Sequence, residues 1–455
     1  MSLTKVTHSM ITPAGYLYVE DFGASPSIAN NAPAINVAIA AADAIGASVF
    51  LTDVYPTTAP IILTPVGGDP VSLYGADMYK SGITYTGSGN AIEINQPGTT
   101  KANQWSINNI KIDGTAGTGH GIYCNYTSIG VIQNCSIYNF AKSAIYYDNQ
   151  CYTQIVNGCF MFNNGSLATY AAITVTGGHD NNGVRIENNV IYNASGQYKA
   201  YGIYVGTVAA AVAIKNNIIE VFTTGILFVG QGEITGNYIE GTNQSSISIK
   251  NNVSVTGNWL NPQGTGATGN FGISIDGNGN YVAGNTCTDT VQYGVNNISG
   301  YGNFVHVYED SVAGASTILN YPWLGNIITR QSSNSMIMAG NFAKTTKIYN
   351  VPADLTTGSL LNGTTNHLAI SGAFGSLVII NITSNASFNI DTVSTPLGSN
   401  YTVGVKNNSG GVMGNIYFID NQTDSSYTKP AIGKIRYADF MQYQMISSFT
   451  GDITF

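Results

Sequence analysis

The chain has 455 residues, enough for one large elongated core or for roughly two to three domains. Only 9% of the residues are charged and the net charge is −8, so we expect no nucleic-acid partner and a neutral surface that suits sugars. The five cysteines show no CxxC pair and no metal-ligand spacing, which predicts free buried thiols in a reducing cytosol, with no metal site and no cofactor.

The N-terminal part divides into a connector, residues 1–17, and a first structured segment, residues 18–104. The connector has no signal-peptide core, and no apolar run reaches the ~18 residues of a membrane span, so we predict no membrane span. Residues at helical spacing predict one amphipathic helix over 31–44: Ala34, Ile35, Ala38, Ile39 and Ala42. Three strands are expected after it: Gly46–Leu51, Pro60–Leu63 and Val71–Gly75.

Residues 105–320 repeat two short phrases at intervals of 20 to 30 residues. The first phrase is a β-branched residue, two small or polar residues, an anchor, any residue and an aliphatic residue. Its anchors are Ile110, Cys135, Cys159, Asn189, Asn217, Asn237, Asn258 and Asn285. The second phrase places an aliphatic residue after a small one, at Ile122, Ile145, Ile173, Ile203, Ile226, Ile247, Ile273 and Val295.

This period predicts a parallel β-helix with one coil per repeat. Such a unit has no room for a helix, which excludes helical and leucine-rich repeats, and four-stranded propeller blades need a longer period. Each strand then stacks on its equivalent ~4.8 Å away. We expect the anchor asparagines to adopt the left-handed backbone of a corner and to hydrogen-bond between coils, with Cys135 and Cys159 as small inward replacements.

The period is lost near Tyr321–Gly325, and residues 321–455 contain short alternating strands separated by turn clusters. The predicted strands are His367–Ile370, Leu377–Ile382, Tyr401–Val405, Ile416–Ile419, Ile435–Tyr437 and Met441–Ile446. The predicted fold class is therefore all-β: a right-handed single-stranded parallel β-helix with an N-terminal capping helix and a C-terminal β-sandwich-like domain.

Several stretches near the N-terminus carry a family resemblance. Val19–Ala24, the helix after it and the strands Gly46–Leu51 and Leu73–Gly75 resemble the start of the pectate-lyase-like β-helix superfamily, and more narrowly of phage tailspike depolymerases. The resemblance covers residues 5–95 by motif and 105–310 by architecture. Residues 25–31 depart from the pattern because they lack the usual acids.

The resemblance implies a homotrimer in which the C-terminal domain helps trimerisation or binds carbohydrate. It implies a virion protein of a phage tail, made in the host cytoplasm and joined to other tail components through its N-terminus. The partner would be a bacterial surface polysaccharide, either capsule or O-antigen.

Acidic residues recur at equivalent outward positions and are the candidate catalytic groups. Glu220 and Glu240 each follow an anchor by three residues on successive coils, so they should stack about 5 Å apart. Like charges this close push one proton onto the pair, which suits glycoside hydrolysis with retention; a wider separation would favour inversion. The alternative is that the two acids are simply solvated or pair with Lys215. Asp276 is a further candidate acid, although an ion pair with Lys250 on the neighbouring coil explains it equally well.

Aromatic side chains in two columns provide flat faces for sugar rings. The candidate substrate-binding residues are Tyr123, Tyr146, Tyr192, Tyr204, Asp148 and Lys250. The alternative is that outward tyrosines simply favour strands. Glu187 and Lys215 also stack in this scheme and are interpreted as a surface ion pair.

Other chemistries stay open. Gly119-His120-Gly121 resembles an element of polygalacturonases, but the paired Asp motifs of those enzymes have no counterpart here. A polysaccharide lyase would need a base and a cation, for which Arg185, Lys199 or Lys250 with a tyrosine could serve. The leading prediction is an endo-glycosidase that depolymerises a surface polysaccharide; a non-enzymatic receptor-binding fibre and a pectinase-like enzyme are the alternatives.

Overall fold

A computed structural model describes residues 15–309, except for 66–69, 97–101, 116–117, 166–169, 195–197, 264–270, 288–292 and 300–302. From residue 310 onward it describes only strands. The chain divides into two compact units, residues 1–273 and 274–455. The predicted connector, residues 1–17, lies largely outside the described residues, as does Tyr321–Gly325.

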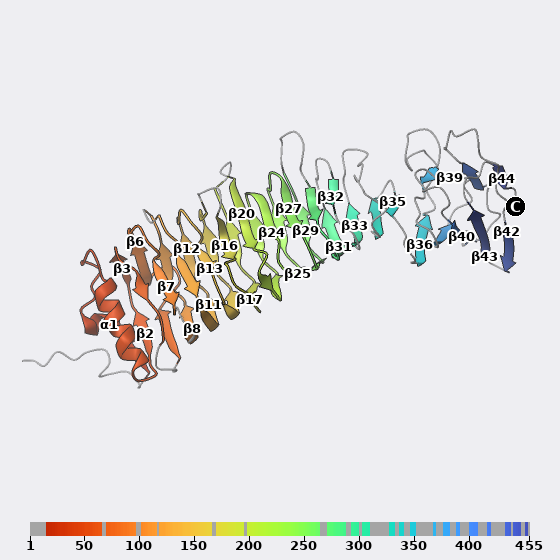
Figure 1. The fold of residues 1–455 in the computed structure, drawn as a ribbon. Coiled ribbons are helices and arrows are strands. Elements are labelled where there is room, and N and C mark those ends of the chain that lie inside the picture. Colours follow the sequence, from red (N-terminus) through yellow and green to blue (C-terminus); the bar gives the residue numbers. More distant parts are fainter. Residues whose placement is uncertain are drawn as a thin grey trace, which may run out of the picture. The chain divides into compact units, whose positions relative to one another are not determined.

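The first unit is a solenoid of parallel strands stacked on three faces (Figure 1). Face 1 consists of β2 (Ser48–Leu51), β5 (Val71–Gly75), β8 (Ala102–Asn108), β11 (Thr127–Gln133), β14 (Tyr152–Asn157), β18 (Arg185–Glu187), β22 (Val212–Lys215), β25 (Gly232–Thr235) and β28 (Val253–Thr256). Face 2 consists of β3 (Val54–Thr57), β6 (Gly82–Tyr85), β9 (Lys111–Asp113), β12 (Ser136–Tyr138), β15 (Phe160–Phe162), β19 (Val190–Tyr192), β23 (Ile218–Glu220), β26 (Tyr238–Glu240) and β29 (Trp259–Asn261). Face 3 consists of β4 (Ile61–Ile62), β7 (Ile92–Asn95), β10 (Ile122–Asn125), β13 (Ile145–Tyr147), β16 (Ala171–Val175), β20 (Lys199–Val205), β24 (Phe222–Phe228) and β27 (Ser245–Ile249).

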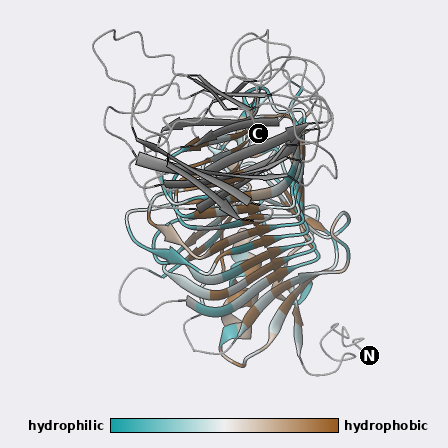
Figure 2. Cartoon of the chain, turned by 90° about the vertical axis from the view of Figure 1, so that its right-hand side faces the viewer, coloured by the Kyte–Doolittle hydropathy of each residue, from teal (hydrophilic) through white to brown (hydrophobic). Residues whose placement is uncertain are grey.

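The strands hold this register because one side of each is apolar and buried. On face 2 the middle residue of each three-residue strand points inward and is fully buried, as at Ile191, Ile219 and Ile239. Apolar segments recur at matching places on successive coils (Figure 2). Since a slip by one residue would bury the outward column, this alternation fixes which residues stack.

The anchor asparagines form the predicted ladder inside the solenoid. Asn189 donates from Nδ2 to Oδ1 of Asn217, Asn217 to Asn237, and Asn237 to Asn258, each over 2.9 Å. All four side chains are at most 2% exposed. Because every amide is satisfied by the coils above and below it, the ladder stabilises both the stacking and the corner.

The left-handed backbone lies one residue earlier than predicted. Asn188, Asn216 and Gly236 have φ values of 58°, 54° and 68°, and each directly precedes an anchor. Two roles that the sequence analysis gave to one residue are therefore divided, because the anchor must point inward while its predecessor makes the bend. Cys135 and Cys159 are buried at the anchor position, as predicted.

An α-helix, α1 (Ala32–Asp43), forms where the Ala-rich pattern predicted one. It buries Ile35, Ala38, Ile39 and Ala42. It packs against β1 (Tyr16–Tyr18), β2, β4 and the short 3-10 helix η2 (Val19–Phe22). The predicted strands after the helix are confirmed as β2, β4 and β5.

Strands of the remaining chain follow the predicted positions closely. β30 (Phe271–Asp276) spans the boundary between the units, and the second unit continues with β31 (Tyr281–Cys287), β32 (Tyr293–Ser299), β33 (Phe304–Glu309), β34 (Ile327–Ser332) and β35 (Met336–Gly340). One further sheet contains β36 (Thr346–Val351), β38 (Ser376–Ile382), β40 (Asn400–Asn407), β43 (Phe440–Ile446) and β42 (Gly433–Tyr437). Another contains β37 (His367–Ala369), β39 (Phe388–Asp391), β41 (Ile416–Ile419) and β44 (Gly451–Ile453). Pairing within them is parallel at first and antiparallel at the C-terminal strands, and the sandwich-like arrangement stays a prediction.

All five cysteines are buried and free, as predicted. Among the described residues, no helix has the length and apolar character needed to cross a membrane.

Candidate active site

The outward column on face 2 brings the two predicted acids together. Glu220 of β23 pairs directly with Glu240 of β26, in the register that the sequence predicted. Tyr192 of β19 lies on the coil before Glu220, and Asn261 of β29 on the coil after Glu240. The vertical alignment therefore holds for the whole set.

The two carboxyl groups have different surroundings. Glu240 accepts hydrogen bonds from the Tyr238 hydroxyl, from Asn261 Nδ2 at 3.3 Å and from Gln263 Nε2 at 2.7 Å. Partial burial and the neighbouring Glu240 carboxylate raise the pKa of Glu220 above its usual value. The pair is thus asymmetric, with the pKa raised at Glu220 and hydrogen-bond donors gathered around Glu240.

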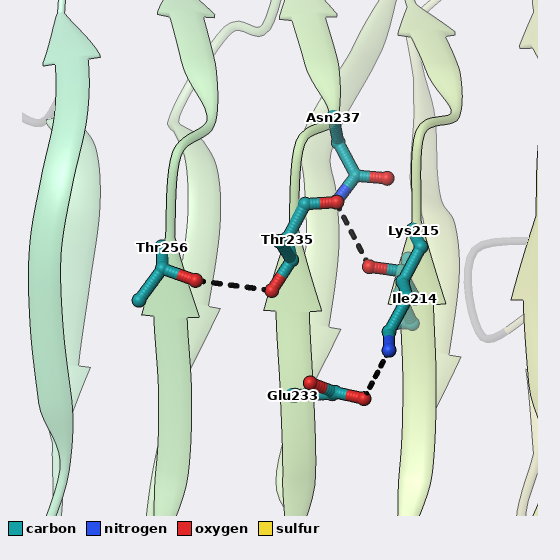
Figure 3. A network of polar contacts seen from close by, with 6 residues as sticks. All are labelled: Ile214, Lys215, Glu233, Thr235, Asn237 and Thr256. Atoms are coloured by element: carbon teal, nitrogen blue, oxygen red, sulfur yellow. Dashed lines mark hydrogen bonds and ion pairs between the residues drawn. The ribbon is translucent and has the colours of Figure 1, made fainter.

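The competing explanation for these acids was pairing with Lys215, and the structure gives that lysine another partner. Lys215 Nζ lies 2.6 Å from Glu233 Oε1 on the next coil of face 1 (Figure 3). Glu187 does align with Lys215 in register, but the ion pair is with Glu233. Lys215 therefore neutralises a face-1 acid.

Aromatic rings flank the acid pair along the coil axis. Tyr192 packs on Phe162, with ring centroids 4.6 Å apart. On the other side, Tyr238, on the same strand as Glu240, stacks on Trp259 of the next coil, with centroids 4.6 Å apart and planes 12° apart. The hydrogen bond to Glu240, together with burial, raises the pKa of Tyr238 to about 12, so its hydroxyl keeps its proton at neutral pH.

Three residues around the acids were not predicted from the sequence: Tyr238, Trp259 and Gln263. The first two directly follow anchors, so they share the outward side of face 2 with the acids. That position was a readable signal, because a strand residue two before an outward residue points the same way. Gln263 follows a strand, where the repeat gives no direction.

The other predicted tyrosines lie on a different face. Tyr123, Tyr146 and Tyr204 belong to β10, β13 and β20 of face 3, with Thr174 of β16 between the last two. Asp148 follows β13 and accepts a hydrogen bond from the Tyr123 hydroxyl at 2.7 Å. The predicted binding tyrosines therefore lie on two faces. Tyr192 on face 2 adjoins the acid pair, and the other three lie on face 3.

The remaining predicted residues stay candidates. Lys250 follows β27 in the first unit and is half-buried. Asp276 ends β30, is exposed, and lies in the second unit. Their proposed ion pair remains a prediction.

No family model matches the chain, and no curated protein matches it. Solved structures do. The A-module of Azotobacter vinelandii mannuronan C-5 epimerase AlgE6 aligns over 90% of this chain and 100% of its own, with 16% identity and a TM-score of 0.54. DFA-IIIase from Arthrobacter chlorophenolicus A6, without its lid, covers 69% of this chain and 98% of its own, with 12% identity and a TM-score of 0.52.

The chain is a parallel β-solenoid. Dettilon tailspike protein also aligns, over 66% of this chain and 69% of its own, with 16% identity and a TM-score of 0.45. At such low identity these likenesses concern the fold. Function has to be argued from the side chains.

Proposed function

We propose that the chain binds and cleaves a polysaccharide as an endo-glycosidase, with Glu220 and Glu240 as its catalytic residues. The observation that carries this proposal is the direct register of the two acids together with the raised pKa of Glu220. A protonated carboxyl beside an ionised one is the arrangement that glycosidic bond cleavage uses.

The asymmetry of the pair suggests the roles. Glu220 protonates the leaving oxygen, because its raised pKa favours the protonated form that a general acid needs. Glu240 attacks the anomeric carbon, held in place by Tyr238, Asn261 and Gln263. Neighbouring coils lie about 4.8 Å apart, and carboxyl groups about 5 Å apart favour a covalent intermediate and retention of configuration. Glu220 then activates the water that releases the product.

The surroundings of the acids favour attack within a polymer chain. The anchors of the coils that carry the acids are only 20 and 21 residues apart, against 28 and 30 on the preceding coils. Shorter coils carry shorter loops. Less chain is therefore present to block the two ends of the surface that would bind the polysaccharide. Aromatic rings at Tyr192 and Trp259 on opposite sides of the pair then provide platforms for sugar units before and after the cleaved bond.

For the biological setting we propose a phage tailspike acting on a bacterial capsule or O-antigen. The support is the N-terminal resemblance at Val19–Ala24 and the following helix. On this proposal the chain is a homotrimer of the virion, α1 caps the first coil, the N-terminal connector joins other tail components and the C-terminal strands form a sandwich-like domain. The C-terminal domain would hold the trimer together or bind carbohydrate.

The test is digestion of purified host polysaccharide, with products separated by size and analysed by NMR for anomeric configuration. Wild type should release oligosaccharides with retained configuration, and Glu220→Gln and Glu240→Gln should each lose at least 100-fold in rate, on the order of the usual effect of a general acid. Glu187→Gln, a half-buried acid on face 1, is the matched control and should keep full activity.

Three outcomes would overturn the proposal. Products that absorb in the ultraviolet through a new C4–C5 double bond would indicate a lyase. Tight binding without any cleavage would indicate a receptor-binding fibre. Full activity of Glu220→Gln would reject the assigned site.

A further inference from the structure

Face 3 carries a second cluster of aromatic and polar side chains, separate from the acid pair. His120, just before β10, lies with its ring centroid 4.3 Å from Tyr146 of β13 and 5.3 Å from Tyr170. Tyr123 stacks beside Tyr146, with centroids 5.9 Å apart and planes 15° apart. Lys142 Nζ lies 5.5 Å from the centre of the Tyr170 ring.

His120 is held neutral and in one tautomer. Its Nδ1 accepts a hydrogen bond from the backbone N–H of Ser143 at 3.2 Å, so the proton is on Nε2. Burial, and next the charge of Lys142, lower its pKa to about 3. His120 is only 5% exposed, and its ring lies against the rings of Tyr146 and Tyr170. Because Nδ1 already accepts a hydrogen bond, the Nε2–H group is the donor that this imidazole can offer to a ligand.

The groups around Tyr146 are arranged with donors at one end and an acceptor at the other. Lys142 precedes β13 and Asp148 follows it, so the two charges lie at opposite ends of a three-residue strand. Burial, with a smaller contribution from Asp148, raises the pKa of Tyr146 to about 12, so its hydroxyl remains a donor at neutral pH. The Tyr123 hydroxyl donates to Asp148, which leaves that carboxylate further lone pairs for hydroxyl groups.

We infer that this cluster is a second carbohydrate-binding site, and that it takes an acidic sugar residue. The sugar ring would pack on Tyr146, with its carboxylate toward Lys142 and His120 and its hydroxyl groups toward Asp148. A neutral sugar would leave the Lys142 ammonium without a charged partner. This inference does not depend on cleavage at Glu220 and Glu240.

The two sites belong to different parts of the first unit. The acids are on β23 and β26 of face 2, whereas the cluster centres on β10 and β13 of face 3. On face 3, β16 and β20 intervene between β13 and β24, the strand that follows Glu220. Three coil steps of about 4.8 Å place the sites on the order of 14 Å apart along the axis, so neither site shares side chains with the other.

The test compares two matched probes, cellohexaose and the same hexasaccharide oxidised to the carboxylate at every C6. Binding is measured by calorimetry at low salt with the full-length Glu220→Gln variant, so that no probe is cleaved. We expect the oxidised probe to bind at least 10-fold more tightly than the neutral one. Adding Lys142→Met should lower the affinity for the oxidised probe at least 10-fold, and adding Tyr146→Ala should lower the affinity for both probes.

The control is Lys215→Met in the same background, which removes one positive charge from face 1 and should leave binding unchanged. Equal affinity for the two probes, no binding of either, or unchanged affinity in Lys142→Met would each overturn the inference. Failure of wild type to cleave any polysaccharide would refute the proposed function and leave these binding results unaffected.

Discussion

Replacing Asn237 by Ala tests the internal ladder that joins the coils carrying Glu220 and Glu240. Its side chain makes five hydrogen bonds. Oδ1 accepts from Asn217 N at 3.0 Å and from Asn217 Nδ2 at 2.9 Å. Nδ2 donates to Ile214 O at 3.0 Å, Thr235 O at 3.2 Å and Asn258 Oδ1 at 2.9 Å. Alanine removes all five inside a dry core.

The expected loss of stability depends on which polar groups keep another hydrogen-bond partner after the substitution. Asn217 Nδ2 still donates to Ile186 O, and Asn258 Oδ1 still accepts from the backbone of residue 237. The backbone N–H of Asn217 loses the acceptor that the structure gives it. One orphaned buried donor at roughly 1–3 kcal/mol and several lost bonds at about 1 kcal/mol each predict a destabilisation of about 3–5 kcal/mol.

The assay is equilibrium urea unfolding followed by far-ultraviolet circular dichroism. Asn243→Ala, an exposed asparagine near the same coil, is the control and should change the free energy of unfolding by less than about 0.5 kcal/mol. If Asn237→Ala were as mild as this control, the ladder would not stabilise the stack, and the reasoning above would be refuted.

Three further predictions concern charge, close approach and the thiols. Because the pKa of Glu220 is raised, its ionisation disfavours the folded state. Glu220→Gln should therefore increase the urea midpoint at pH 7 relative to wild type, and this gain should vanish near pH 4. A variant that is less stable than wild type at pH 7 would contradict the raised pKa. A Cβ on Gly232 would lie 2.0 Å from Val212 O, whereas a Cβ on Gly257 would meet nothing within 4 Å. In the same unfolding assay, Gly232→Ala should therefore lower the free energy of unfolding by at least about 3 kcal/mol, and Gly257→Ala by only about 1 kcal/mol. All five thiols should resist Ellman's reagent in the native protein and react after denaturation, and rapid native labelling of any of them would contradict their burial.

Vertical neighbours could be predicted from the sequence, because a repeated phrase identifies equivalent positions without any knowledge of the corners. The register of Glu220 with Glu240 and the Asn217–Asn237 contact follow from this alone. The helix α1 could also be predicted, since Ile35 and Ile39 recur at helical spacing.

Lateral neighbours could not be predicted in the same way. The period does not give the angle between faces. From the sequence alone it could not be predicted whether the tyrosines of face 3 and the acids of face 2 share one surface. The partner of Lys215 was wrong for a related reason: Glu187 and Glu233 lie on the coils before and after it, and only the side-chain geometry selects Glu233. Lys142 and Tyr170 lie outside the repeated phrases, where the sequence pattern carries no directional information.

Because the strands stack in register, outward side chains in one column can be separated only by whole coil steps. Two outward groups in one column are either one winding apart, about 5 Å, or two windings apart, about 10 Å, with no backbone position between. These steps are close to the two carboxyl separations that distinguish retaining from inverting glycosidases. A scaffold of this kind could therefore change its stereochemical outcome by relocating a single acid one repeat along the chain, for example from Glu240 to the Asn261 position, without any rearrangement of the fold.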